Sequence, residues 1–306
     1  MKDSTWAPIE TTISSLLTDS QAPLDSLAAG ETPAIILRQA WSPEECESLY
    51  QRLIDDELLY DPHRPIPDRF LEASIPEGYF REGIQGTEHN VRREQIEFNN
   101  RRIDIGTSLG YRGSDPEAFF AHAEETHQLF SRLFADRRNP IDLIYQTLGA
   151  LAPGKEAVTA HEPDGRRYGP AIIRAHYGGY TYRPHFDSVR LREKRDDYSV
   201  VQFDHQFAGV LVLKNTEREG KTAQCVIHRC LWNPEVQPSL DRGTFHDYAR
   251  EHNIENVEIH LEPGDLYFFN TRSIHEVPGI AGDEPRVVVA TFIGYSSDRE
   301  EIFVWS

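Results

Sequence analysis

The pattern of the chain changes at residue 171, and this change most limits the folds available to it. From there to residue 295, short runs rich in β-branched and aromatic residues alternate with clusters of Gly, Pro and polar residues, which is typical of strands and turns. The runs are Ala171–Tyr177, Phe207–Leu213, Ala223–Ile227, Val257–Leu261, Asp265–Phe269 and Arg286–Tyr295. Many short strands with long connections favour an antiparallel double-sheet jelly roll. We therefore predict a mainly β protein with flanking helices around a double-stranded β-helix core.

The residues before this core are predicted to support it. Residues 1–32 are polar and are expected to form a loose arm with one short helix near Ile9–Leu17. Residues 33–306 are expected to form a single domain, in which 33–170 is a mixed helical support region and 171–306 is the core.

Three helices of the support region have readable starts. Ser42 is the expected N-cap of the first, with Pro43 at the first helical position. A capping box from Ser114 to Glu117 and an Asn139-Pro pair begin the other two. Their apolar faces are Cys46, Leu49 and Leu53; Phe119, Ala123, His127, Phe130 and Phe134; and Ile141, Ile144, Leu148 and Leu151. Short strands are predicted at Pro33–Leu37, Gln95–Phe98 and Arg102–Ile105. The two helices that follow Ser114 and Asn139 are expected to pack on the outer face of a sheet.

The charge balance argues against several classes of partner. The chain has 32 Lys and Arg against 50 Asp and Glu, so its net charge of −18 repels nucleic acids and anionic membranes. Its three Cys residues form no CxxC motif, which favours free thiols in a reducing compartment. No signal peptide or membrane-spanning stretch is visible in the sequence. We expect a cytoplasmic protein that binds neither nucleic acid nor membrane, and we find no signal for its oligomeric state.

A His and an Asp separated by one residue follow the first predicted strand of the core. His185 and Asp187 come after a Gly-Gly turn, and alternate residues of an extended chain share a face. His275 lies at the far end of a later apolar run, after an interval long enough for about four or five strands. Two neutral imidazoles and one carboxylate bind one face of a ferrous ion and leave its other positions open. We predict that His185, Asp187 and His275 bind iron.

Two further triplets compete for the role of metal motif. His122-Ala-Glu124 lies within a predicted helix, where residues two apart do not share a face. His260-Leu-Glu262 precedes a Pro-Gly-Asp turn and has no partner pattern after it. Both are weaker candidates than the His185 motif.

Arg286 begins a strongly apolar predicted strand, from which its side chain can point into the barrel. A guanidinium among apolar residues needs an anion, and its planar fork binds a carboxylate through two hydrogen bonds. A dicarboxylate cosubstrate would satisfy it. With the iron motif, Arg286 indicates a non-haem iron oxygenase that depends on 2-oxoglutarate.

The order of these motifs resembles that of the Fe(II)/2-oxoglutarate dioxygenase superfamily, and within it the prolyl-4-hydroxylase-like branch. That branch has a Tyr before a Gly turn, an HxD motif, a strand ending in Leu-x-Asn, a Pro-Gly-x-Leu turn, a His, a Gly and a basic residue. The corresponding residues here are Tyr177, Gly179, His185, Asp187, Leu213-Lys-Asn215, Pro263-Gly-Asp-Leu266, His275, Gly282 and Arg286. The resemblance is good over 171–295, loose over 33–55, and says little about 56–170.

This resemblance implies a cupin-like fold, a site for Fe(II), and 2-oxoglutarate and O2 as cosubstrates. It implies that Arg286 binds the C5 carboxylate of 2-oxoglutarate and that Tyr177 donates a hydrogen bond to the same molecule. Two departures stand out. The loop after Tyr177 is one residue shorter than in relatives, and Val288 stands where many relatives have Ser or Thr, so that Thr291 is the candidate to compensate. Halogenating relatives have a small residue in place of Asp187, so the carboxylate favours hydroxylation, or a related desaturation or ring-forming oxidation.

Two long connections, 188–206 and 229–256, are predicted lids, and the second is expected to contain a helix at Leu240–His252. Five basic residues flank the metal motif: Arg183, Arg190, Arg192, Lys194 and Arg195. They form either a solvated loop or a basic lid that recognises an anionic substrate. His228 and Trp232 either face the pocket or belong to the fold. Enclosing inserts favour a small-molecule substrate such as an amino acid or a natural-product intermediate, and a protein substrate stays open as the alternative.

Two other functions remain open at this stage. A metal-binding cupin-type isomerase or sensor would use the metal ligands without 2-oxoglutarate and would not require Arg286. A purely structural barrel would require neither, and the combined His, Asp, His and Arg pattern argues against it.

Overall fold

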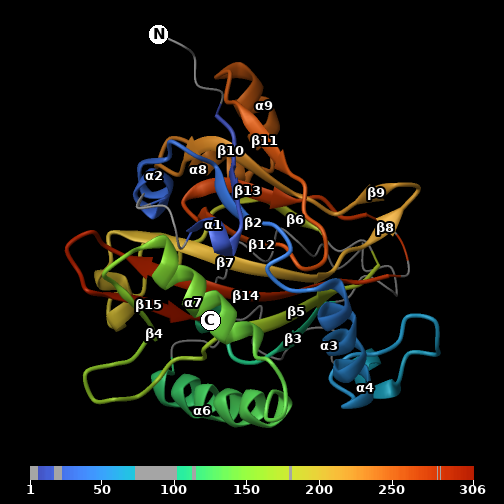
Figure 1. Ribbon diagram of the computed structural model, residues 1–306. Helices are drawn as coiled ribbons and strands as arrows, with labels where there is room; N and C mark the ends of the chain where they lie inside the picture. The colour runs from blue at the N-terminus through green and yellow to red at the C-terminus, as the bar shows by residue number, and fades with distance from the viewer. Residues whose placement is uncertain are drawn as a thin grey trace.

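The strands form two facing sheets and a short hairpin, with helices around them (Figure 1). The computed structural model describes residues 6–16, 23–72, 102–111, 115–178, 181–280, 282 and 284–306. The predicted strand Gln95–Phe98, the capping residue Ser114 and the turn residue Gly179 lie outside the described residues.

The larger sheet has nine strands within the described residues. Its main path runs through β1 (Ile9–Thr11), β2 (Ala34–Leu37), β12 (Leu266–Asn270), β7 (His205–Lys214), β14 (Arg286–Tyr295), β15 (Glu301–Trp305) and β4 (Glu156–Thr159). Off this path, β5 (Ile172–His176) pairs with β14, and β3 (Arg102–Ile105) pairs with β5. The pairs β1–β2 and β15–β4 are parallel, and the others are antiparallel.

The smaller sheet has four antiparallel strands and lies over the larger one (Figure 1). Its order is β11 (Asn256–Ile259), β10 (Cys225–Leu231), β13 (Ser273–Val277) and β6 (Tyr182–His185). The hairpin consists of β8 (Glu217–Arg218) and β9 (Lys221–Thr222). Two packed, largely antiparallel sheets confirm the predicted jelly-roll core, although β6 and β13 were absent from the predicted strands.

The central strands of the larger sheet are buried on both faces. On β7, Ala208, Val210 and Val212 pack in the core between the two sheets, whereas Phe207 and Leu211 pack in the core on the helix side. Alternate residues of a strand point to opposite faces, so the parity of the residue number decides which core a side chain enters. This rule also places the residues of the functional site.

Helices α3 (Pro43–Asp55) and α7 (Pro140–Leu151) cover the far face of the larger sheet, which was predicted for α7. The other helical segments are α1 (Ile13–Leu16), α2 (Pro23–Ala29), α4 (Asp68–Glu72), α6 (Pro116–Leu133), α8 (Gln237–Asp241), α9 (Phe245–Glu251) and the 3-10 turns at Leu109–Tyr111 and Ser199–Gln202. Among the described residues, no helix is both long enough and apolar enough to cross a bilayer.

The helix starts follow the expected capping chemistry. The Ser42 hydroxyl accepts from the Glu45 N–H, and the Glu45 carboxylate accepts from the Ser42 N–H, which completes a capping box at α3. Asn139 caps α7 as predicted. The N-cap of α6 is Asp115, whose carboxylate accepts from two backbone N–H groups of the first turn.

The N-terminal segment differs from the predicted loose arm. Residues Ile9–Thr11 form β1, and on α2 the side chains of Leu24 and Leu27 are fully buried in the helix-side core. These apolar residues, three apart on a helix, cover the sheet and hold the segment against it. The polar composition of 1–32 concealed this short apolar face.

The predicted single helix at Leu240–His252 is two helices, α8 and α9. Gly243 separates them with a positive φ of 67°, a conformation that ends a helix and that glycine adopts without strain. The region 229–256 therefore folds as a strand end followed by two short helices beside the smaller sheet (Figure 1).

Candidate metal and cosubstrate site

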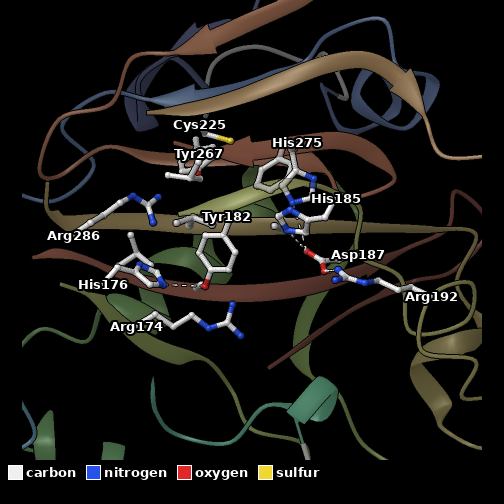
Figure 2. Close-up of a pocket in the computed structure, with 16 residues that line it drawn as sticks. Arg174, His176, Tyr182, His185, Asp187, Arg192, Cys225, Tyr267, His275 and Arg286 are labelled. Carbon is white, nitrogen blue, oxygen red and sulfur yellow. Dashed lines mark hydrogen bonds and ion pairs between the residues drawn. The ribbon is translucent and has the colours of Figure 1, made fainter. Parts of the chain in front are cut away.

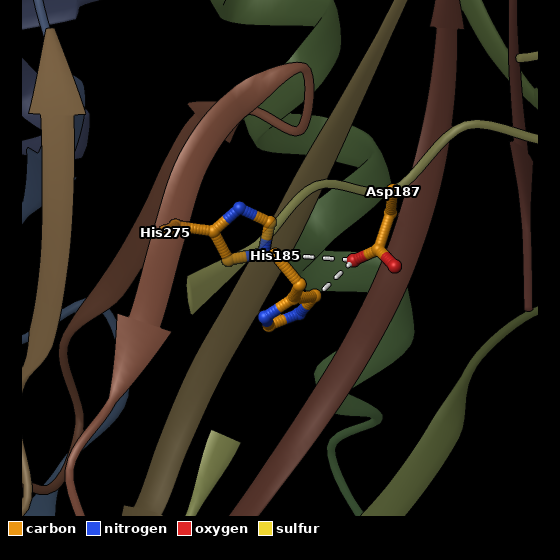
Figure 3. A group of neighbouring side chains, drawn as sticks. All are labelled: His185, Asp187 and His275. Atoms are coloured by element: carbon orange, nitrogen blue, oxygen red, sulfur yellow. Dashed lines mark ion pairs between the residues drawn. The ribbon is translucent and has the colours of Figure 1, made fainter. Parts of the chain in front are cut away.

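Three side chains from two neighbouring strands and the loop after one of them converge on one point (Figure 3). His185 ends β6, His275 lies in the middle of β13, and the two are direct cross-strand partners. Asp187 follows β6 and is held by hydrogen bonds in both directions between its backbone and Thr271. The Asp187 Oδ2 atom lies 3.7 Å from His185 Nε2 and 3.5 Å from His275 Nε2. The structure thus brings the three predicted iron ligands together.

The hydrogen bonds behind the two imidazoles decide which nitrogen carries the proton. His185 Nδ1 lies 2.6 Å from the Arg183 carbonyl oxygen, and His275 Nδ1 lies 2.9 Å from the Ser273 carbonyl oxygen. A carbonyl only accepts, so each Nδ1 is the N–H donor and, in the neutral ring, each Nε2 presents a lone pair. Two lone pairs and a carboxylate oxygen then face one another with no proton between them. A cation satisfies this arrangement, and metal-binding imidazoles are held in the same way.

Burial and charge keep these groups in the state that binds a metal. Burial, followed by the neighbouring His275, lowers the pKa of His185 to about 3, so this imidazole is neutral at pH 7. Burial acts to raise the pKa of Asp187, but His185, His275 and Arg192 outweigh it and lower that pKa. The carboxylate is therefore ionised. Two imidazoles and one carboxylate are the donor set of non-haem ferrous sites.

A cavity of about 100 Å³ lies beside this triad, between the two sheets (Figure 2). The larger sheet lines it with even-numbered residues of β5, β7 and β14 and with odd-numbered residues of β12, and the smaller sheet supplies the opposite wall. Its polar and aromatic lining consists of Arg174, His176, Tyr182, His185, Asp187, Arg192, Cys225, Tyr267, Phe269, His275 and Arg286. A mostly apolar cleft with a few convergent polar groups is the usual form of a small-molecule site.

Arg286 lies in this cavity and is 6% exposed. Its cross-strand partner on β5 is His176, and Figure 2 shows Arg286 across the cavity from Asp187. Among the residues that the structure describes, no carboxylate lies within 4 Å of its guanidinium, whereas Arg102 and Arg174 both contact Asp104. A buried guanidinium without a carboxylate is matched to an anionic ligand.

Tyr177 and Thr291 lie elsewhere. The Tyr177 ring stacks on Tyr60 with centroids 4.1 Å apart, and its hydroxyl donates to the Tyr60 carbonyl at 3.0 Å in the helix-side core. The Thr291 hydroxyl donates to the Gly209 carbonyl at 3.3 Å. Both residues are odd-numbered and face away from the cavity, which even-numbered residues of β5 and β14 line. This geometry does not fit the expectation that either residue contacts 2-oxoglutarate.

Tyr182 is a cavity residue that the sequence analysis did not single out. Its hydroxyl lies 2.9 Å from His176 Nε2, and its ring lies near that of His185, with centroids 5.7 Å apart. Burial, followed by the charges of nearby arginines, lowers the pKa of His176 well below its ordinary value, so His176 is neutral. The signal available in the sequence was spacing, because Tyr182 lies close before His185 in the same extended segment.

The basic residues around the metal motif divide into different environments. Arg192 lines the cavity and its side chain is 18% exposed, whereas Arg190 and Lys194 are exposed. Arg195 contacts the neighbouring Glu193 carboxylate, and burial raises the pKa of Glu193 to about 7. The loop is thus neither wholly solvated nor a uniform basic lid.

A second group of possible ligands consists of His228, His246 and Glu276. His228 Nε2 lies 3.0 Å from Glu276 Oε1, and His246 Nε2 lies 3.3 Å from Glu276 Oε2. The Nδ1 atom of His228 is buried and has no hydrogen-bond partner in the part of the chain that the structure describes, so the His228 proton belongs on Nε2, where it bonds to Glu276. The two imidazoles thus contact separate oxygens of Glu276, and this arrangement does not require a cation.

The remaining candidates lie outside both groups. Neither His122 with Glu124 nor His260 with Glu262 belongs to a cluster of three ligands in the described ranges. Trp232 stacks on Phe186, with ring centroids 4.6 Å apart, and is not a cavity residue.

A family model described as carrier-protein-independent halogenase WelO5 matches residues 9–306. The chain belongs to this family. Its membership confirms the predicted Fe(II)/2-oxoglutarate-dependent oxygenase superfamily and the prediction that the protein is an enzyme of that superfamily. No curated protein matches the chain.

Solved structures share the fold of this WelO5-family chain. An N-substituted L-amino acid dioxygenase from Burkholderia ambifaria AMMD superposes with a TM-score of 0.52 and 16% identity, over 93% of this chain and 91% of that chain. The structure of a novel N-substituted L-amino acid dioxygenase from the same organism in complex with alpha-KG gives a TM-score of 0.52 and 14% identity, over 97% and 92%. At such identities the likeness concerns the fold alone.

Proposed function

We propose that the protein is a non-haem Fe(II)/2-oxoglutarate-dependent hydroxylase that acts on an unactivated C–H bond of a small molecule. The observation that carries the proposal is the convergence of two imidazole lone pairs and the Asp187 carboxylate beside a cavity. When bound, iron and 2-oxoglutarate supply the oxidising chemistry, in which O2 and 2-oxoglutarate are consumed, succinate and CO2 are released and the substrate C–H becomes C–OH. The chain itself supplies the ligands, the orientation and the enclosure.

The proposed roles follow from the contacts of each residue. His185 and His275 bind iron through Nε2, and Asp187 binds it through Oδ2. Arg286 binds the C5 carboxylate of 2-oxoglutarate across the cavity, because a bidentate carboxylate supplies the anion that its guanidinium lacks. Tyr182 and Tyr267 line the space between these two ends (Figure 2). A cupin-type protein that binds only metal would have no use for a buried Arg286, which supports the oxygenase over that alternative.

Asp187 supports hydroxylation over the halogenation in the family's name. A halogenase needs a metal position for a halide, and the resemblance noted above associates that chemistry with a small residue at this place. Here the Asp187 carboxylate reaches both imidazoles. A halide and this carboxylate would compete for the same position, so the site is proposed to transfer oxygen.

The proposed substrate is a small molecule that carries an acidic group. Arg174 and Arg192 line the cavity in addition to Arg286; each contacts an Asp carboxylate, but a guanidinium has five N–H donors and so retains others for a ligand. The fold is also that of an enzyme whose substrates are N-substituted L-amino acids. Anionic and N-substituted amino acids are therefore the first compounds to test.

The experiment titrates anaerobic Fe(II) protein with 2-oxoglutarate and follows the visible charge-transfer band of the chelate. We expect the band in the wild type, no band with His275→Ala, and a much higher 2-oxoglutarate requirement with Arg286→Ala. Loss of the charge-assisted pair costs about 2–5 kcal/mol, or roughly 30-fold or more in affinity. Succinate release then identifies the substrate among candidate compounds.

Two comparisons make this experiment decisive. Arg190→Ala, which removes an exposed arginine, is the matched control and should titrate as the wild type does. If the wild type binds metal and no band forms at any 2-oxoglutarate concentration, the oxygenase proposal fails and the metal-binding cupin-type function replaces it.

A further inference from the structure

The two oxygens of the Asp187 carboxylate have different partners. Oδ2 faces the Nε2 atoms of His185 and His275, whereas Oδ1 accepts a hydrogen bond from Arg192 Nη1 at 2.5 Å. A hydrogen bond between two charged groups is about twice as strong as one between neutral groups. The carboxylate is therefore divided into an oxygen directed at the metal position and an oxygen already occupied by a guanidinium.

The loop after β6 holds Arg192 in this place. Arg192 Nη1 also donates to the Phe186 carbonyl at 2.6 Å, and its backbone N–H donates to the Ser188 carbonyl at 3.1 Å. The Ser188 hydroxyl in turn accepts from the Leu191 N–H at 3.0 Å. The segment thus folds back on itself so that Arg192, five residues after Asp187, returns to its carboxylate. Only 18% of the Arg192 side chain is exposed, so solvent screens the pair weakly.

We propose that Arg192 is a positioning residue that makes Asp187 a one-oxygen ligand and so keeps metal positions open for 2-oxoglutarate and O2. This inference rests on the proposed function. A free carboxylate can chelate a metal with both oxygens, which takes one more position. With Oδ1 bonded to Arg192, only Oδ2 is available, and the site retains the open positions that two-His, one-carboxylate oxygenases need. Partners of metal ligands tune metal affinity by about 10–100-fold.

The test measures Co(II) binding to metal-free protein by visible absorption, and then 2-oxoglutarate binding to the Co(II) form. Neither measurement requires turnover. We expect Arg192→Gln to weaken 2-oxoglutarate binding to the Co(II) form, because an Asp187 that chelates the metal occupies a position that the cosubstrate needs. The Co(II) absorption should also change, because a second carboxylate oxygen alters the coordination geometry.

Two further variants separate positioning from a general structural effect. Arg192→Lys restores a cation near Oδ1 and should recover much of the lost 2-oxoglutarate affinity. Arg190→Gln alters an exposed arginine of the same loop and should behave as the wild type. A residue with only a structural role would lower the melting temperature of the metal-free protein without changing the Co(II) spectrum of the folded fraction.

Infrared difference spectra of Co(II) binding to the wild type give a measurement that depends on no variant. One-oxygen coordination separates the two carboxylate stretching bands more widely than chelation does. A chelate pattern in the wild type, or wild-type 2-oxoglutarate affinity in Arg192→Gln, would overturn the inference and leave the proposed function standing. If the wild type binds no metal, the proposed function fails and the inference fails with it.

Discussion

His185 and His275 are direct cross-strand partners on β6 and β13, with ring centroids 4.2 Å apart. The pairing of two strands from distant parts of the chain therefore sets the distance between the two imidazoles. The register shifts just beyond His275 on the way to Val277, so the site lies at an irregular end of this ladder. Metal affinity should respond to changes in this pairing as well as to changes in the ligands themselves.

Shortening Asp187 should create a halide site. Asp187→Gly removes the carboxylate and leaves the Arg192 guanidinium without its anion, so a chloride ion is favoured at the vacated position. We expect chloride, compared with sulfate, to strengthen Co(II) binding to this variant by about tenfold, equivalent to about 1.4 kcal/mol. Asp187→Asn fills the same space and should show no chloride effect. Chloride-independent binding in Asp187→Gly would contradict the prediction.

Two tyrosines near the metal motif should have opposite roles. Tyr182→Phe removes a hydroxyl from the cavity together with its hydrogen bond to His176, and should weaken 2-oxoglutarate binding severalfold. Tyr177→Phe removes a buried hydrogen bond to Tyr60, and should lower the free energy of unfolding by about 1 kcal/mol with little effect on 2-oxoglutarate. Isothermal titration and urea unfolding of both variants measure the difference. An inverted result would place Tyr177 at the cosubstrate.

A hydroxyl on β14 should affect 2-oxoglutarate affinity only if it lies on the strand face that lines the cavity. Val288 shares the cavity face with Arg286, so Val288→Thr adds a hydroxyl there and should tighten 2-oxoglutarate binding by up to about 1 kcal/mol, roughly fivefold. Thr291→Val alters the opposite face and should leave this affinity unchanged. Titrating the Fe(II) charge-transfer band in both variants compares them. A loss of affinity in Thr291→Val would refute this assignment of faces.

Glu193 should make stability depend on pH. Burial raises its pKa from 4.5 to about 7, and among the described residues Glu193 Oε2 has an ion-pair contact with Arg195 but no hydrogen bond. Between these pH values the folded protein keeps a proton that the unfolded chain releases, so stability falls as pH rises. Glu193→Gln carries no charge and escapes this loss. The unfolding free energy of Glu193→Gln minus that of the wild type should rise by up to about 3 kcal/mol between pH 5 and pH 8.

Denaturant unfolding of the metal-free protein at the two pH values checks this prediction. Because the comparison is between variant and wild type at each pH, the titration of all other groups cancels. A constant difference across the range would show that Glu193 titrates alike in the folded and unfolded chains.

Several features of the site were predictable because they depend on residue type and local spacing. The ligand chemistry of His185, Asp187 and His275 follows from the residues themselves, and the capping box at Ser42 follows from four consecutive positions. The apolar faces of α3 and α7 follow from helical periodicity, because each of these helices has one buried side. These features can be predicted from the sequence because each depends on residue type or on spacing within one element.

The faces of the central strands were not predictable from the sequence. Strands β7 and β14 are buried on both sides, between the smaller sheet and the helices, and both parities are largely apolar. A strand buried on both faces reads as a continuous apolar run, and its pattern does not show which parity faces a cavity. Tyr177 was assigned to the cosubstrate from the resemblance, and Thr291 because Val288 departs from it. Tyr182 was overlooked because β6 was not among the predicted strands.

The residue types alone indicated which groups are available to this protein: two imidazoles, a carboxylate and a guanidinium. The folded structure determines which nitrogen and oxygen atoms of these groups face the metal position. The carbonyls of Arg183 and Ser273 set the protons of the two imidazoles, and Arg192 divides the Asp187 carboxylate. These contacts depend on strand pairing and on a folded loop, since a hydrogen bond needs both partners within about 3 Å at a suitable angle.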